Sequence, residues 1–158
     1  MEKFIILAGS PNVGKTCTTH KVILRLLSDG YAIYGYFTDD TEKEFWLKVN
    51  EKGNPQKSGS VILKKDDKKI VVITYGDTED SLKLVFDNIN FDDYYAIVCC
   101  SHATRGRKVF KYFHDEIISK IDLNKTQVIP IHKNFLYGYN EELENKKTAE
   151  LIIKLLEI

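Results

Sequence analysis

The chain has little cysteine, little proline and no excess of charge of either sign. Its 158 residues include 3 cysteines and 3 prolines, and 23 Lys plus Arg balance 23 Asp plus Glu. So few cysteines, two of them adjacent at Cys99 and Cys100, exclude a disulfide framework and a C-x-x-C metal site and favour a reducing cytoplasm. Without net charge, the chain lacks the field that would hold it on bulk nucleic acid or an anionic membrane.

Long hydrophobic runs are also missing. No apolar stretch approaches the ~20 residues that a membrane-spanning helix needs. Residues 1–8 lead straight into a glycine-containing turn, without a signal-peptide cleavage pattern. The hydrophobic share is 43 %, which is enough for a packed core. The sequence therefore predicts one globular cytoplasmic domain, 1–158, with no membrane partner.

Short apolar runs alternate with amphipathic segments, a pattern typical of a mostly parallel sheet with helices on both faces. Strands are predicted at residues 4–8, 31–37, 94–100 and 127–131, and helices over 15–28, 79–88, 107–120 and from Glu141, after an Asn140 N-cap, almost to the last residue. Residues 61–64 and 70–74 flank a polar tip, which predicts a hairpin whose second arm is a central strand. Residues 38–60 have a weak pattern and are interpreted as an insertion that could move.

One motif carries the functional argument. The segment Gly9-Ser10-Pro11-Asn12-Val13-Gly14-Lys15-Thr16 matches G-x-x-x-x-G-K-[ST] and lies between an apolar run and an amphipathic helix. The two glycines let the backbone curl so that successive N–H groups point at phosphate oxygens, and the positive end of the following helix adds to the attraction. A chance match in an ordinary strand-turn-helix connection is the alternative. The flanking strand and helix favour a phosphate-binding loop.

The motif assigns roles to individual side chains. Lys15, expected to be an exposed loop residue, would reach the β and γ phosphates, and the Thr16 hydroxyl would ligate Mg²⁺. The predicted nucleotide contacts are the loop and the residue after it: Gly9, Pro11, Asn12, Val13, Gly14, Lys15, Thr16 and Cys17. No N-K-x-D guanine reader follows a late strand, His132-Lys133-Asn134 being the nearest sequence, so ATP is the expected nucleotide.

A triphosphate site also needs an acid near the metal, at the carboxyl end of a neighbouring strand. Asp77 follows the second hairpin arm through Tyr75-Gly76 and is the predicted metal residue. A turn or helix-capping role for Asp77 is the alternative. Asp39 and Asp40, which follow a less certain strand, would then face the metal, an acceptor substrate or solvent.

Basic residues follow the buried run 94–100. Arg105 and Arg107 lie in the segment Ser101-His102-Ala103-Thr104-Arg105-Gly106-Arg107-Lys108, at the sheet edge where α/β proteins bind ligands. Arginine there would neutralise charge on a transferring phosphoryl group. A solvated helix start is the alternative, although cations oppose the helix dipole at that position.

Three other notable side chains are interpreted as structural. His20 lies one turn past Thr16 and is expected at the surface or in packing, not as a base. Cys99 and Cys100 are expected in the core, because nothing near them in the sequence would lower a thiol pKa.

From Gly9 to Thr16 the chain resembles the P-loop NTPase superfamily. It also resembles a group of small bacterial and phage P-loop proteins in which a hairpin arm ends in Gly-Asp, here Gly76-Asp77, and a later strand ends in Cys before Thr-Arg-Gly, here Thr104-Arg105-Gly106. The likeness covers most of the chain up to Gly106, with departures at Ser101-His102 and Arg107. It implies a three-layer α/β P-loop NTPase fold with a β-hairpin addition and nucleotide binding. P-loop kinases are a looser match, with an arginine-bearing lid after the fourth core strand.

The resulting expectation is an ATP- and Mg²⁺-binding protein that transfers the γ-phosphoryl group to a small molecule or nucleotide. In this interpretation Lys15, Asp77, Arg105 and Arg107 act on the triphosphate, and Thr16 and Asp77 hold the metal. One alternative is a nucleotide-dependent switch or slow ATPase that acts through a protein partner, with residues 38–60 as the moving element. Another is a nucleotide-binding module without turnover.

Overall fold

A computed structural model describes most of the chain. The described residues are 1–9, 14–36, 59–74, 79–87, 89–102, 113–133 and 140–157. The predicted insertion therefore lies outside the described residues from 38 to 58, and Ser60 already belongs to a strand.

The described strands form one mixed sheet. They are β1 (Lys3–Gly9), β2 (Ala32–Tyr36), β3 (Ser60–Lys65), β4 (Lys68–Ile73), β5 (Ala96–His102) and β6 (Gln127–Lys133), in the order β2-β3-β4-β5-β1-β6. From β4 to β6 all neighbours pair in parallel, whereas β2-β3 and β3-β4 are antiparallel. The predicted mostly parallel α/β sheet with a hairpin addition is confirmed, and so is the central position of the second hairpin arm.

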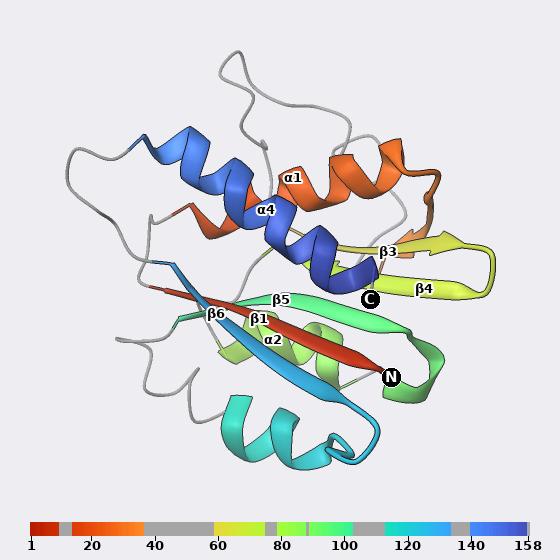
Figure 1. The fold of residues 1–158 in the computed structure, drawn as a ribbon. Helices are drawn as coiled ribbons and strands as arrows, with labels where there is room; N and C mark the ends of the chain where they lie inside the picture. The colour runs from red at the N-terminus through yellow and green to blue at the C-terminus, as the bar shows by residue number, and fades with distance from the viewer. Residues whose placement is uncertain are drawn as a thin grey trace.

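Helices cover both faces of the sheet (Figure 1). Helices α1 (Lys15–Ser28) and α4 (Glu141–Glu157) pack on one face, and α2 (Glu79–Phe86) and the turns of 113–120 pack on the other. Strand β1 shows why both faces are needed. Ile5 and Leu7 join the core under α1 and α4, whereas Phe4 and Ile6 join the core under α2, because successive strand side chains point to opposite faces.

Local signals fixed several element ends as predicted. Helix α1 has the predicted bounds and stops before Gly30, whose φ of +97° places it in the left-handed region that favours glycine. Asn140 caps α4, since its side-chain oxygen accepts a hydrogen bond from the Leu143 N–H at 3.1 Å. The hairpin turn is only Asp66 and Asp67, and Asp66 has a φ of +52°, which aspartate tolerates better than most residues.

The predicted regular helix over 107–120 is wrong in its described part. Residues 113–120 form a π-helical turn, Phe113–Ile117, followed by a 3-10 turn, Ile118–Lys120. The apolar face is nevertheless as expected, because Ile117 and Ile121 are both buried in the core under α2. Burying each such side chain contributes roughly 1.5–3 kcal/mol, and this burial does not require the hydrogen-bonding pattern of one continuous α-helix.

Candidate functional site

The glycine-rich segment begins and ends at the carboxyl edge of the parallel strands. Gly9 is the last residue of β1, and Gly14 is the residue before α1. Ser10, Pro11, Asn12 and Val13 lie outside the described residues. Gly14 has φ +87° and ψ +23°, a left-handed conformation that turns the chain into the helix. The first-turn N–H groups of a helix have no intrahelical acceptor, so this end of α1 is able to bind an anion.

Lys15 folds back over this segment. Its Nζ donates to the Gly9 carbonyl at 2.6 Å, and the residue is only 7 % exposed. The expectation of an exposed lysine is therefore wrong. The physical reason is that the aliphatic stem packs at the start of α1 while the ammonium finds a backbone acceptor at the end of β1. This contact holds a positive charge at Gly9, where the predicted phosphate loop begins.

Thr16 links the start of α1 to a second strand. Its hydroxyl donates to the backbone carbonyl of Thr74 at 2.9 Å, and Thr74 directly follows β4. The expectation that Asp77 follows a direct neighbour of the loop strand is wrong, because β5 lies between β4 and β1. Since α1 lies across this face of the sheet, Thr16 still reaches the end of β4, three residues before Asp77 in the sequence.

Cys17 follows Thr16 in the first turn of α1. Its thiol is half-buried, and the pKa of the thiol is raised, first by burial and then by the nearby Glu141 carboxylate. A raised pKa keeps the thiol protonated at neutral pH. The side chain is therefore not an activated nucleophile.

Apart from Lys15, the acidic and basic residues assigned to catalysis lie outside the described residues. This applies to Asp77, Arg105 and Arg107, and also to Asp39 and Asp40. The strand that leads to the arginines is described, and its last residue, His102, is opposite Gly9 in the β1-β5 register. The residues after His102 therefore continue from the same edge of the sheet as the glycine-rich segment.

The structural interpretation of three other side chains holds. Cys99 and Cys100 are in the core on opposite faces of β5, and burial raises the pKa of the Cys99 thiol well above its usual value. His20 is buried on α1, and its pKa is lowered, chiefly by burial and then by Lys21. An imidazole with a lowered pKa is neutral at pH 7.

A buried polar cluster beside the loop was missed from the sequence. Lys133, the last residue of β6, is opposite Gly9 in the β1-β6 register and is 1 % exposed. Its ammonium pairs with Glu144 and donates to Asn145 Oδ1 at 2.7 Å. The sequence offered one weak signal, a lysine directly after an apolar strand. In the sequence the same lysine belongs to His132-Lys133-Asn134, the segment nearest to a guanine-reading motif.

Gly14 is the residue in this site where substitution should be least tolerated. We expect Gly14→Ala to lower the free energy of unfolding by roughly 3 kcal/mol, from left-handed strain and from overpacking. A Cβ there would lie 2.4 Å from Asn145 Oδ1. Gly30→Ala is the matched control, because Gly30 is also left-handed but a Cβ would meet only the end of the Lys65 side chain, at 3.5 Å. Urea unfolding measures both variants, and equal losses would contradict the expected clash with Asn145.

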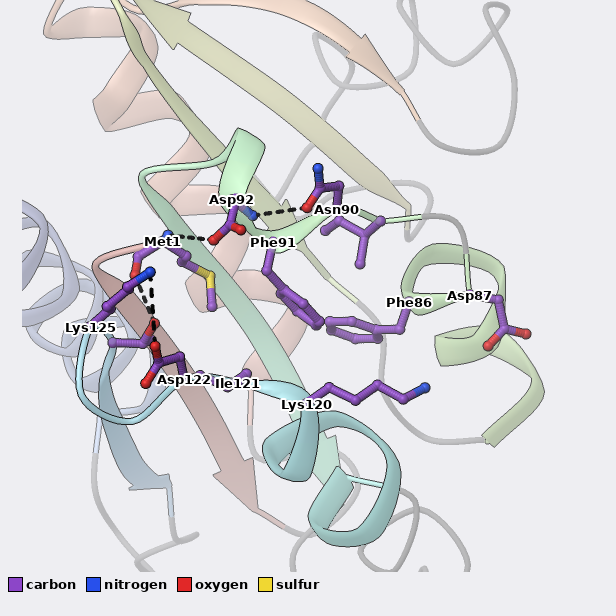
Figure 2. A pocket seen from close by; sticks show the side chains of 12 residues that line it. Met1, Phe86, Asp87, Asn90, Phe91, Asp92, Lys120, Ile121, Asp122 and Lys125 are labelled. Carbon is purple, nitrogen blue, oxygen red and sulfur yellow. Dashed lines mark hydrogen bonds and ion pairs between the residues drawn. The ribbon is translucent and has the colours of Figure 1, made fainter.

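A hollow lies at the amino ends of the parallel strands, away from the glycine-rich segment (Figure 2). It has a volume of about 580 Å³, and the rings of Phe86 and Phe91 form part of its wall. Two pairs of charged groups line it: Lys125 with Asp122 at 4.0 Å, and the Met1 amino group with Asp92 at 3.9 Å. It lies by Met1, at the amino end of β1, whereas the glycine-rich segment starts at the carboxyl end of the same strand.

Across the described residues, no three His, Cys, Asp or Glu side chains come together as a metal-ligand set. None of the helices in the described ranges is both long and apolar enough to cross a membrane. Comparisons with family models, with curated proteins and with solved structures found no match to this chain.

Proposed function

We propose that this protein binds ATP with Mg²⁺ through Gly9 to Thr16 and transfers the γ-phosphoryl group to a small molecule or nucleotide. The proposal includes a P-loop NTPase fold, which agrees with the mixed sheet and its two helical layers. One observation carries it. A G-x-x-x-x-G-K-T segment joins the carboxyl end of a central parallel strand to a helix, with the Lys15 ammonium held at the Gly9 carbonyl where the segment begins.

The position of the segment in the sheet supports phosphate binding independently of the motif. Ligands of open α/β sheets bind at the carboxyl ends of the strands. The ends of β1, β5 and β6 meet there, since Gly9 is in register with both His102 and Lys133. The amino end of α1 adds first-turn N–H groups, which have no acceptor within the helix, and a partial positive charge at the same edge.

The residues present fit a magnesium ion of the kind that accompanies a nucleotide. Such an ion takes one or two protein oxygens and completes its shell with phosphate and water, so it needs no cluster of three protein ligands. The Thr16 hydroxyl donates its proton to the Thr74 carbonyl. Its lone pairs are thereby left for a cation, which is the arrangement that a metal-binding hydroxyl requires.

In the proposed reaction the chain's own groups position and neutralise charge. Lys15 would exchange the Gly9 carbonyl for phosphate oxygens, a stronger, charge-assisted partner. Thr16 and Asp77 would hold the ion, which supplies positive charge to the β and γ phosphates when bound. Arg105 would stabilise the charge that develops on the transferring group, with Arg107 in a lesser role. The acceptor oxygen would attack the γ phosphorus and lose its proton to solvent, and ADP would leave with the electrons of the broken bond.

The direct test is calorimetry of the wild-type protein with ATP and with GTP, each with Mg²⁺ and with EDTA. We expect heat with ATP that is larger with Mg²⁺ and is reproduced in part by tripolyphosphate, because the predicted loop recognises phosphate. Binding of GTP in preference to ATP would correct the base assignment. The absence of heat with every nucleotide would refute the proposal.

The role of Asp77 makes a separate prediction. We expect Asp77→Asn to weaken ATP binding several-fold with Mg²⁺ present and to leave binding in EDTA unchanged, because the amide keeps the shape but loses the charge that holds the hydrated ion. Titration calorimetry at several Mg²⁺ concentrations measures this, and Asp87→Asn, at the end of α2, is the control. Equal affinity of Asp77→Asn and wild type at every Mg²⁺ concentration would assign Asp77 to a turn or cap and turn attention to Asp39 and Asp40.

A further inference from the structure

A chain of buried polar contacts connects the last strand, the last helix and the start of α1. Its members are Lys133 on β6, Glu144 and Asn145 on α4, and Thr18 on α1, which reaches Gly14. Helices α1 and α4 lie together on the same face of the sheet (Figure 1). Thr18 and Asn145 are 127 positions apart in the sequence, so only the tertiary fold brings them together.

The centre of this cluster is the Asn145 amide, which is 4 % exposed. Its orientation is fixed, because the Lys133 ammonium has only donors and must face the amide oxygen, at 2.7 Å. Thr18 Oγ1 lies 3.2 Å from the same oxygen and 2.7 Å from the Gly14 carbonyl. A hydroxyl has one proton, so Thr18 links Gly14 and Asn145 by sharing it between the two acceptors.

The Asn145 amide occupies the space beside the Gly14 Cα that a side chain would fill in any other residue. A Cβ at Gly14 would lie 2.4 Å from Asn145 Oδ1 and 2.8 Å from Nδ2. Gly14 therefore has to be a glycine for two independent reasons, its φ of +87° and the presence of Asn145. The left-handed conformation of Gly14 is the one that presents its Cα to the amide.

Lys133 and Glu144 keep the Asn145 amide in place. Lys133 is 1 % exposed, and a lysine so deeply buried needs a charged partner and further hydrogen bonds. Glu144 supplies the charge, and Thr148 in turn donates to Glu144 Oε1 at 2.9 Å. The cluster is anchored on β6 directly beside Gly9, so it spans both described ends of the glycine-rich segment.

We propose that Asn145, oriented by Lys133, is a positioning residue that holds Gly14 and the first turn of α1 in the phosphate-binding conformation. This inference rests on the proposed function for the identity of the ligand. Its structural half stands alone, because it concerns the conformation of the free protein. Preorganising a loop raises affinity by increasing the fraction of molecules that are ready to bind.

The structural half is tested by amide hydrogen exchange of the free protein. We expect Asn145→Ala to speed exchange in peptides covering residues 14–20 and to leave β4 and the last two turns of α4 unchanged. Two variants serve as controls. Lys146→Ala changes an exposed neighbour of Asn145 and shows the effect of a surface substitution on α4. Ile153→Val changes a buried residue farther along α4 and shows the effect of a general loss of stability. If Asn145→Ala does not fold, Thr18→Val should show the same local change, because it removes the hydroxyl that links Gly14 to the amide.

The ligand half is tested by calorimetry of the same variants with Mg²⁺-ATP and with tripolyphosphate. We expect both to bind roughly tenfold more weakly to Asn145→Ala, as if the competent conformation fell to about a tenth of the population. Equal losses for the two ligands support positioning of the phosphate loop, since only the phosphates are shared. Ile153→Val should bind both as wild type does.

Two results would overturn the inference. Exchange in residues 14–20 that equals wild type, or that rises everywhere, would make Asn145 an ordinary packing residue. Faster local exchange with unchanged affinity would show that Gly14 needs no external support to bind phosphate. If the wild-type protein binds neither ligand, the proposed function is refuted instead. The hydrogen-exchange result then decides the structural half of the inference by itself.

Discussion

Lys15→Ala should remove most of the protein's affinity for Mg²⁺-ATP, by about 100-fold or more. Charge-assisted hydrogen bonds contribute ~1.5–3 kcal/mol each, and a loss of ~3 kcal/mol corresponds to a factor of about 100 in the dissociation constant. The substitution also removes the bond to the Gly9 carbonyl, so we expect a stability loss of ~1 kcal/mol, not an unfolded protein. Titration calorimetry and thermal unfolding of the same sample separate the two effects.

Lys21→Ala is the matched control for Lys15→Ala. Lys21 is on the same helix, with a side chain 31 % exposed and 4.0 Å from Glu142, so it tests the general loss of a lysine from α1. We expect its affinity for ATP to stay within about twofold of wild type, because exposed pairs of this kind contribute little. Equal losses at Lys15 and Lys21 would mean that α1 attracts ATP through overall charge and not through a specific lysine contact.

Arg105→Ala should lower turnover far more than it lowers ATP binding, on the order of 10³-fold in kcat. The reason is that an arginine on the transferring phosphoryl group acts chiefly on charge that develops in the transition state. The strand before it supports this placement, since β5 lies directly beside β1 and its last residue, His102, is opposite Gly9. Arg107→Ala should have a smaller effect.

Single-turnover release of phosphate, with ATP titration of the same variant, separates chemistry from binding at Arg105. Arg25→Ala is the control, because Arg25 is near the far end of α1, where it pairs with Asp29 at 3.1 Å. A variant that loses binding and turnover equally would make Arg105 a nucleotide clamp. A variant that loses neither would favour the nucleotide-dependent switch, with the basic segment facing a protein partner.

Local sequence determined much of the fold. The sequence predicted the bounds of α1, the Asn140 cap of α4 and the hairpin of β3 and β4, because each depends on residues close together in the chain. The described parts of the glycine-rich segment also lie as predicted, since a strand, a turn and a helix in succession place Gly9 and Gly14 at one sheet edge. Periodicity also identified the apolar face of residues 113–121, although not the irregular turns that present it.

Strand order was decided only by tertiary structure. Apolar runs show which segments are buried, but they do not show which runs are neighbours, because pairing depends on contacts between distant segments. The sequence therefore predicted that the chain runs from the carboxyl end of β4 to Asp77. The prediction that β4 is a direct neighbour of β1 was wrong, since β5 separates the two strands. The contact of Thr16 with Thr74, which brings the end of β4 to the site, depends on the path of α1 across the sheet.

The burial of Lys133 is the other feature that only the tertiary structure decided. From the sequence, a lysine after an apolar strand is expected to reach solvent, because its charge is costly to bury. In the fold, α4 brings Glu144 and Asn145 to its ammonium and thereby offsets that cost. The sequence by itself determined a G-x-x-x-x-G-K-T motif between a strand and a helix, whereas the three-dimensional packing of β6 and α4 placed the Asn145 amide against Gly14.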